Sequence, residues 1–147
     1  IIITGRTKNF INACGEELVV ENADQAVQAA CCRCQALVKE YTAAPLYGEQ
    51  RAAARHQWLF EFEQAPADLL KFSSILDEEL KKRNSDYEAK RYKNLNLAPP
   101  FLMIARPGLF YDWLKENKRL GGQAKIPRLA NDRQIMETLL VFNQRKL

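Results

Sequence analysis

Trp58-Leu59-Phe60-Glu61-Phe62 is the stretch of sequence that decides the fold. Its aromatic side chains stand at every second position, and alternate side chains of a β-strand point to the same face of a sheet. The aromatic face is therefore expected to form the inner side of a sheet. Tyr41 to Leu46 is a second extended segment, and the polar residues from Gly48 to Arg55 connect the two. Together they predict an antiparallel hairpin with a long loop.

Helical patterns surround this hairpin. Apolar residues at helical spacing, with capping side chains or proline at the start, indicate about five helices. We expect them from Asn22 to about Val38 or Lys39, from Pro66 to Asn84, from Ser85 to about Lys93, from Leu109 to Arg119, and from Asn131 onward. Short strands are expected at Asn9 to Asn12, before a turn at Gly15, and at Phe101 to Ile104. The irregular order predicts an α+β fold, a small and mostly antiparallel sheet with helices packed on it.

The helix that Pro66 opens has two distinct faces. Its expected inner stripe consists of Leu69, Phe72, Ser73, Leu76 and Leu80. Its other face carries Asp77, Glu78, Lys81 and Lys82. This charged face has the composition of a solvated surface with ion pairs one turn apart, so we expect these four side chains to lie in water.

The composition is that of one soluble domain. The 147 residues are 47% hydrophobic, and the net charge of +4 is spread over interspersed basic and acidic residues. Such mixing is unlike a nucleic-acid footprint. No apolar run could span a bilayer and no signal-peptide pattern is present, so we expect no membrane contact and a cytoplasmic location. The chain starts with Ile1, Ile2 and Ile3 instead of methionine, and such strand-like residues predict the carboxy-terminal part of a larger protein.

The cysteines and the single histidine do not form a metal-binding pattern. Cys14, Cys31, Cys32 and Cys34 lack the second regular pair, or the spaced histidines, that zinc requires. Cys31 and Cys34 instead share a helical face with apolar residues, where reduced thiols pack as small hydrophobic groups. His56 stands alone at the head of a strand and is interpreted as structural or solvated.

Gly121 to Arg128 is a basic loop between two helices. Its two glycines give backbone freedom, Pro127 stiffens its exit, and Lys125 and Arg128 have no acidic neighbour within it. Such a loop suits an anionic group, either a phosphate or a carboxylate. Two other interpretations stay open on these residues alone. The loop could be a solvated basic turn, or Lys125 and Arg128 could close the carboxyl end of the preceding helix.

Motifs along the chain resemble a known enzyme family. Gly5-Arg6-Thr7-Lys8, which follows an isoleucine strand, is similar to the hinge between the large and small domains of adenylate-forming enzymes. Four further stretches are Asn12 to Leu18, Asn84 to Arg91, Gly108 to Trp113 and Gln123 to Arg128. They resemble the carboxy-terminal domain of the Gretchen Hagen family of acyl acid-amido synthetases, the auxin-responsive enzymes of plants and their bacterial relatives. The similarity covers nearly the whole chain, and its last stretch is the most specific.

The resemblance implies the mobile lid domain of a two-domain ligase. Residues 1–8 would end the hinge, residues 9–147 would form the lid, and a large amino-terminal domain would be missing from this chain. The whole enzyme would use ATP and Mg²⁺ to adenylate a small carboxylic acid and would then transfer the acyl group to an amine, typically an amino acid. The fragment alone would be inactive and would hold no cofactor.

The same resemblance assigns roles to individual residues. Lys125 would be the catalytic lysine that stabilises charge building on the phosphates. Lys8 would be the hinge residue and Arg6 would steady the hinge. These two residues, with Gln123 and Arg128, are the expected cofactor-binding set, and no metal ligand is expected.

Two departures and one alternative qualify this interpretation. The glycine-lysine pattern that carries the terminal lysine of acyl-CoA synthetases is absent from Gln144 to Leu147, so Lys125 is assigned from the narrower family pattern. Asn12 to Leu18 differs from the plant members, which leaves the acid and the amine open. The alternative is a basic interaction or RNA-binding module without catalysis, which would use Lys90, Arg91, Lys93, Lys118, Arg119 and Lys125. Because aromatic residues do not interleave with these basic ones, nucleic acid is the less favoured partner.

Overall fold

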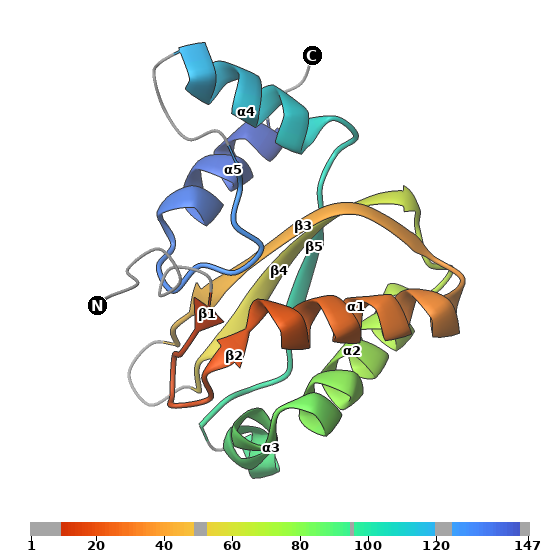
Figure 1. Ribbon diagram of the computed structural model, residues 1–147, viewed down its shortest axis with the longest axis vertical. Helices are drawn as coiled ribbons and strands as arrows, with labels where there is room; N and C mark the ends of the chain where they lie inside the picture. The colour runs from red at the N-terminus through yellow and green to blue at the C-terminus, as the bar shows by residue number, and fades with distance from the viewer. Residues whose placement is uncertain (1–9, 49–52, 95, 120–124, 145–147) are drawn as a thin grey trace.

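Residues 10–48, 53–94, 96–119 and 125–144 are described by a computed structural model. Their elements are β1 (Phe10–Ile11), β2 (Leu18–Val19), α1 (Val20–Cys34), β3 (Leu37–Leu46), β4 (Arg55–Gln64), α2 (Leu69–Arg83), α3 (Ser85–Arg91), the 3₁₀ helix η2 (Tyr92–Asn94), β5 (Phe101–Ile104), α4 (Leu109–Arg119) and α5 (Gln134–Gln144). Figure 1 shows the long strands at the centre, with α1 and α2 below them and α4 and α5 above. The α+β class expected from the sequence is confirmed.

The central sheet has the strand order β3-β4-β5. β3 and β4 form the expected antiparallel hairpin, whereas β5 runs parallel to β4. A parallel neighbour requires a crossover connection, and here the chain crosses through α2 and α3 before it returns as β5. β1 and β2 form a separate antiparallel pair around the turn at Gly15, whose φ of 99° is a conformation that glycine adopts without strain.

β4 sends side chains into two hydrophobic cores. Trp58 and Phe60 are fully buried on the side of the sheet that α1 and α2 cover. Leu59, between them, is fully buried in a second core. The second core also contains Leu109, Phe110, Trp113, Met136 and Leu139, which come from α4 and α5. The aromatic inner face is therefore confirmed, and the opposite face is covered as well because two further amphipathic helices pack on it.

Aromatic rings line the first core in a continuous row. Tyr41 stacks on Trp58 with ring centroids 5.7 Å apart, and Trp58 stacks on Phe60 at 5.8 Å. Phe72 of α2 meets the edge of this row, with its ring centroid 5.4 Å from that of Phe60 and 5.5 Å from that of Phe62. Such edge-to-face and offset pairs each add about 0.5–1.5 kcal/mol beyond the burial of their area. The row fixes α2 on the sheet.

The first helix differs from its sequence-based bounds. α1 begins at Val20, and Asn22 lies inside its first turn, where the Asn22 carboxamide accepts a hydrogen bond from the Val19 amide at 3.3 Å. The helix ends at Cys34, and Gln35 follows in the left-handed conformation with φ of 53°. The expected end near Val38 or Lys39 is wrong because those residues already belong to β3. Over so few residues, the spacing of apolar side chains in a strand can equal that in a helix, so the pattern does not show where the helix ends.

The second helix also begins later than expected and buries a charge. Asp68 caps α2, because its carboxylate accepts from the amides of Leu70 and Lys71, so Pro66 precedes the helix. The expectation that Asp77 is solvated is wrong. Asp77 is only 9% exposed, and its carboxylate accepts hydrogen bonds from side chains of α3. The reason is that α3 folds back onto the flank of α2, which the helical pattern alone does not indicate.

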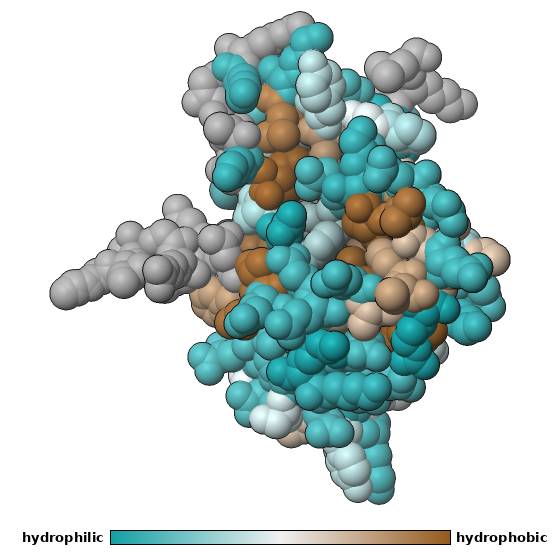
Figure 2. Space-filling view, turned by 45° about the vertical axis from the view of Figure 1, so that its right-hand side comes forward, coloured by the Kyte–Doolittle hydropathy of each residue, from teal (hydrophilic) through white to brown (hydrophobic). Residues whose placement is uncertain are grey.

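The face of the molecule in Figure 2 is largely hydrophilic. Figure 2 shows hydrophobic residues on one side of the molecule in separate patches, one of them in the upper part, at the height of α4 and α5 in Figure 1. The most exposed large apolar side chains of the described residues are Leu70 at 82% and Tyr111 at 67%, which lie on different helices. Single exposed apolar residues of this kind are normal on a soluble surface.

Candidate functional site

The segment that carries Lys125 is fixed along the outer edge of β3. The Ala43 amide donates to the Arg128 carbonyl at 2.9 Å, and the Ala130 amide donates to the Ala43 carbonyl at 3.0 Å. Leu129, between these two anchor points, is fully buried. We call residues 125–130 the edge segment. It forms a parallel bridge to β3, so the backbone near Lys125 is attached to the sheet instead of being a free loop.

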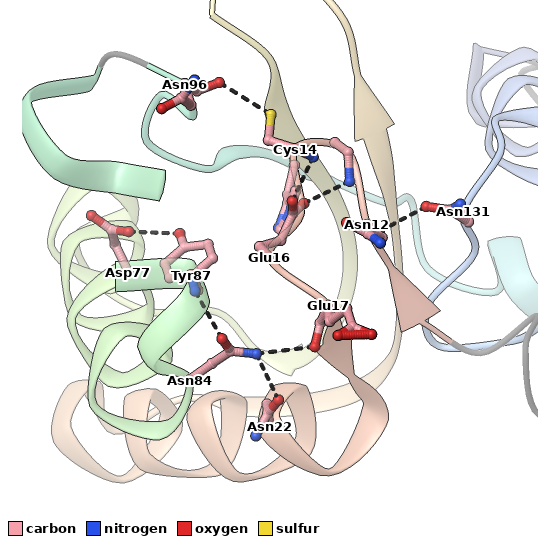
Figure 3. A network of polar contacts seen from close by, with 12 residues as sticks. Asn12, Cys14, Glu16, Glu17, Asn22, Asp77, Asn84, Tyr87, Asn96 and Asn131 are labelled. Atoms are coloured by element: carbon pink, nitrogen blue, oxygen red, sulfur yellow. Dashed lines mark hydrogen bonds and ion pairs between the residues drawn. The ribbon is translucent and has the colours of Figure 1, made fainter. Parts of the chain in front are cut away.

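Two side-chain hydrogen bonds hold the edge segment, one in its middle and one just beyond its end. The Thr42 hydroxyl donates to the Pro127 carbonyl at 2.7 Å. Just beyond the segment, the carboxamide oxygen of Asn131 accepts from the Asn12 amide at 2.7 Å, as Figure 3 shows. Asn12 directly follows β1, so the beginning of the described fold contacts the loop that follows the edge segment. These contacts join parts of the chain that are 85 and 119 residues apart.

Arg128 is held by α1 and β3. Its Nη1 lies 3.0 Å from the Asp24 carboxylate, and its guanidinium lies 5.9 Å from the centroid of the Tyr41 ring. Asp24 also accepts a hydrogen bond from the Tyr41 hydroxyl. Burial, together with this hydrogen bond and the charge of Asp24, raises the pKa of Tyr41 far above its ordinary value. Tyr41 is therefore a neutral donor at any physiological pH, and it orients the carboxylate toward Arg128.

Lys125 stands at a cleft between the edge segment and α4. The cleft has a volume of about 360 Å³ and is lined by Glu40, Phe110, Leu114, Lys125, Ile126 and Arg128. Lys125 is exposed and makes no ion pair with any residue in the described part of the chain. The cleft thus combines an apolar wall from α4 with a lysine whose charge is available to a ligand. Such a lysine is a compact charge that suits a phosphate or carboxylate oxygen.

The structure describes only some of the residues that the sequence assigns to the site. Lys125 and Arg128 lie together in the edge segment and line the same cleft. Arg6, Lys8 and Gln123 lie outside the described residues. The interpretation that Arg128 closes the carboxyl end of α4 is not supported, because its ion pair goes to Asp24 on α1. Sequence alone does not indicate that pair, since Asp24 is 104 residues away from Arg128.

The basic residues of the RNA-binding alternative do not form one surface. Arg91 is buried at 7% exposure and is paired with Asp77, so it does not face a partner. Lys90 and Lys93 lie in or just after α3, whereas Lys118 lies in α4. Figure 1 shows α3 and α4 at opposite ends of the molecule. A nucleic-acid surface needs clustered positive charge, so this arrangement does not favour that alternative.

A buried carboxylate holds the turn between β1 and β2. Glu16 is completely buried, and its carboxylate accepts hydrogen bonds from the amides of Ala13 at 2.9 Å and Cys14 at 2.6 Å (Figure 3). Its Oε2 also lies 2.7 Å from Nε2 of His56, which is 1% exposed in β4. Burial opposes ionisation, but the hydrogen bonds and the charge of His56 outweigh it and lower the pKa of Glu16 to about 2. His56 is therefore structural.

A second buried network connects α2 and α3. The Tyr87 hydroxyl donates to the Asp77 carboxylate at 2.6 Å, as Figure 3 shows. Nε of Arg91 donates to the same carboxylate oxygen at 2.8 Å. Burial acts against the ionised carboxylate, yet Arg91 and Tyr87 together hold the pKa of Asp77 below its ordinary value. Asn84 ends α2 and caps α3 by accepting from the Tyr87 amide. These residues build the scaffold and lie away from the cleft at the edge segment.

The thiols and the acidic residues provide no metal site in the described part of the chain. Within those residues, no group of three or more histidine, cysteine, aspartate or glutamate side chains could hold a metal ion. All four cysteines are free, and Cys31 and Cys34 pack against the first core as expected, whereas Cys32 is exposed. No helix among the described residues is long and apolar enough to cross a membrane.

The fold is one that acyl acid amido synthetases of known structure contain. The structure titled "GH3.15 acyl acid amido synthetase" superposes with a TM-score of 0.71 at 14% sequence identity over 91% of this chain. The structure titled "AtGH3.15 acyl acid amido synthetase in complex with 2,4-DB" gives a TM-score of 0.70 at 13% identity over 91% of this chain. Residues 21–134 match the model of the GH3 family C-terminal domain, and the chain belongs to that family.

These comparisons confirm the family that the sequence motifs predicted. They also show how much of a whole family member this chain spans. The chain spans 26% and 25% of the two solved chains, which is about a quarter of each. No curated protein matches the chain significantly. The matched region includes the edge segment and ends at the start of α5.

Proposed function

We propose that this chain is the mobile C-terminal domain of an ATP-dependent acyl acid-amido synthetase, and that Lys125 acts in adenylate formation. The observation that carries the proposal is the placement of Lys125. It is exposed beside a cleft of about 360 Å³, it belongs to a segment attached to the sheet edge, and it has no ion-pair partner among the described residues. Membership in the GH3 family supports the proposed class of reaction.

The first half-reaction explains the need for such a lysine. An oxygen of the substrate carboxylate forms a bond to the α-phosphorus of ATP while the bond to pyrophosphate breaks. Negative charge builds on the phosphate oxygens during this step, and a positioned ammonium group stabilises it. In the second half-reaction, an amine nitrogen bonds to the acyl carbon and AMP leaves with the electron pair of the broken C–O bond. The product is an amide, and the amine, an amino acid in this proposal, releases a proton.

The remaining groups of the site complete the proposal. Arg128 and Gln123 would contact the nucleotide beside Lys125, and Arg6 and Lys8 would contribute from the hinge. Mg²⁺ would be carried by the phosphates of ATP and by groups beyond the described residues, because those residues include no group of side chains that could hold a metal. The pockets for nucleotide and acid would lie in an amino-terminal domain, so the chain alone would be inactive. We place the reaction in the cytoplasm, where ATP is abundant.

ATP–pyrophosphate exchange by the full-length parent protein tests this function directly. A panel of small carboxylic acids is assayed with the wild type, with Lys125→Ala, and with Lys71→Ala as a control that removes an exposed lysine on α2. We expect exchange that depends on one acid and that falls on the order of a hundredfold or more in Lys125→Ala, because one charge-stabilising group is lost. Lys71→Ala should match the wild type. An unchanged exchange rate in Lys125→Ala would remove that residue from the chemistry.

A further inference from the structure

Thr42 is a buried polar residue at the edge of the central sheet. It is 2% exposed, and it lies opposite Leu59 in the β3–β4 ladder, so its side chain points to the side of the sheet that α4 and α5 cover. A hydroxyl in such surroundings needs a hydrogen-bond partner. Its partner is the Pro127 carbonyl at 2.7 Å. This carbonyl lies two residues beyond Lys125 in the chain.

The bond from Thr42 attaches the edge segment at a residue whose own backbone donates nothing to the sheet. Pro127 has no amide hydrogen, so it cannot donate to the sheet. The backbone bonds of the segment are instead made at Arg128 and Ala130, both to Ala43. Of the described attachments to the sheet, the bond from the Thr42 hydroxyl to the Pro127 carbonyl is therefore the one nearest to Lys125. Between that point and Lys125 only Ile126 intervenes, and Ile126 is half-buried at the cleft.

We infer that Thr42 is a positioning residue for Lys125, which fixes the direction in which the edge segment leaves the sheet. The inference rests on the proposed function, because it assigns a catalytic consequence to the position of Lys125. A displacement of about 1 Å in a positioned group can lower a rate on the order of a hundredfold, so one hydrogen bond at the base of the segment is enough to matter. Thr42 itself does not reach the reacting atoms.

The test compares three variants of the full-length protein. Thr42→Val removes the hydroxyl and keeps the shape of the side chain, Thr42→Ser keeps the hydroxyl, and Thr138→Val is a control that makes the same substitution at an exposed threonine. The Thr138 hydroxyl bonds the Ile135 carbonyl and the Trp113 indole on α4 and α5, away from the edge segment. If Thr42→Val does not fold, Thr42→Ala takes its place. Circular dichroism and thermal unfolding show which variants are folded.

Two readouts separate positioning from general stability. We expect Thr42→Val to lower kcat for ATP–pyrophosphate exchange about tenfold while KM for ATP stays within about twofold, and Thr42→Ser to restore kcat, because the lost bond is one that orients Lys125. Hydrogen exchange of the Ala130 amide, which donates to Ala43, should be faster in Thr42→Val and normal in Thr42→Ser and Thr138→Val. Aminolysis of a supplied acyl-adenylate should change less than adenylate formation.

The inference is overturned if Thr42→Val keeps the wild-type kcat, if Thr138→Val lowers kcat equally, or if Thr42→Ser fails to restore it. If the wild type shows no exchange with any acid, the result counts against the proposed function itself, and the catalytic role of Thr42 falls with it. Hydrogen exchange at Ala130 would then still decide whether Thr42 holds the segment on the sheet.

Discussion

Glu16 and His56 are 40 residues apart in sequence and meet at 2.7 Å in the interior of the molecule. Their contact joins the turn between β1 and β2 to the second residue of β4. Both side chains are almost completely buried, and the Glu16 carboxylate also binds two backbone amides of its own turn. The first hairpin of the described fold is thus fixed to the central sheet by one carboxylate.

This contact predicts an acid-dependent loss of stability. The pKa of Glu16 in the fold is about 2, below the ordinary value of 4.5. Its ionised form therefore stabilises the fold fully above about pH 4.5, and that contribution is lost as the pH falls from there toward 2. The difference between these two pKa values corresponds to a contribution on the order of 3 kcal/mol to the free energy of unfolding.

Urea unfolding between pH 6 and pH 2.5 should show that the wild type loses more stability than Glu16→Gln. Parallel pH profiles for the two proteins would contradict the assignment, and Glu17→Gln, on the adjacent exposed residue, serves as a control.

Removal of the Arg91 guanidinium should destabilise the fold strongly. Arg91→Met removes the nearer charged partner of the buried Asp77 carboxylate and leaves Lys81, 3.7 Å away, and breaking a buried ion pair typically costs about 3–5 kcal/mol. Adding Asp77→Asn removes that charge and keeps an acceptor for the Tyr87 hydroxyl, so the double variant should be more stable than Arg91→Met alone. A double-mutant cycle by urea unfolding measures the coupling between the two residues. Strict additivity of the two single effects would show that the pair does not interact.

Gly108 provides a backbone conformation that other residues adopt at a cost. Its φ is 83°, and a Cβ added there would meet nothing closer than the Asp112 carboxylate at 3.9 Å. Gly108→Ala should therefore lower stability through backbone strain, by about 1–2 kcal/mol, and without a steric clash. Gly108→Asn should cost less, because asparagine tolerates positive φ. Thermal unfolding measures both. Equal losses for alanine and asparagine would indicate another cause, such as a weakened bond from the Gly108 amide to Glu61.

The four cysteines should differ in their reaction with alkylating agents. Cys32 is exposed, whereas burial raises the pKa of both Cys31 and Cys14, and the charge of Glu16 adds to the effect on Cys14. Because the thiolate is the reactive form, Cys32 should be labelled first by limiting iodoacetamide. Peptide mass spectrometry identifies the labelled site, and Cys32→Ser should remove the fast phase. Earlier labelling of Cys31 or Cys14 would mean that this part of the fold opens locally.

Local patterns were enough to predict most elements of this fold. The alternating aromatics predicted β4, and the apolar spacing from Leu109 predicted α4. The bounds of α1 were wrong at both ends, because Val20 to Asn22 and Leu37 to Lys39 fit either of two structures until tertiary contacts select one. Asp77 was also misplaced, since its burial depends on α3 packing against α2. A helical pattern describes one helix and not its neighbours.

The candidate site was predicted in part for the same reason. Lys125 and Arg128 stand close together in sequence, so a basic motif indicated them. Their surroundings come from elsewhere in the chain. Asp24 and Thr42 reach the edge segment from 104 and 85 residues away. No spacing rule connects such residues, and only the folded sheet brings them to the same edge.

β4 belongs to both hydrophobic cores, because Trp58 and Phe60 point to one side and Leu59 to the other. If either core loses its packing, one face of β4 is exposed, and the other core also depends on β4. The two layers should therefore melt as one cooperative unit, with equal calorimetric and van't Hoff enthalpies. In the proposed function, a domain without a separately melting half would turn as a rigid body, and Lys125 would then keep its place relative to the other described groups.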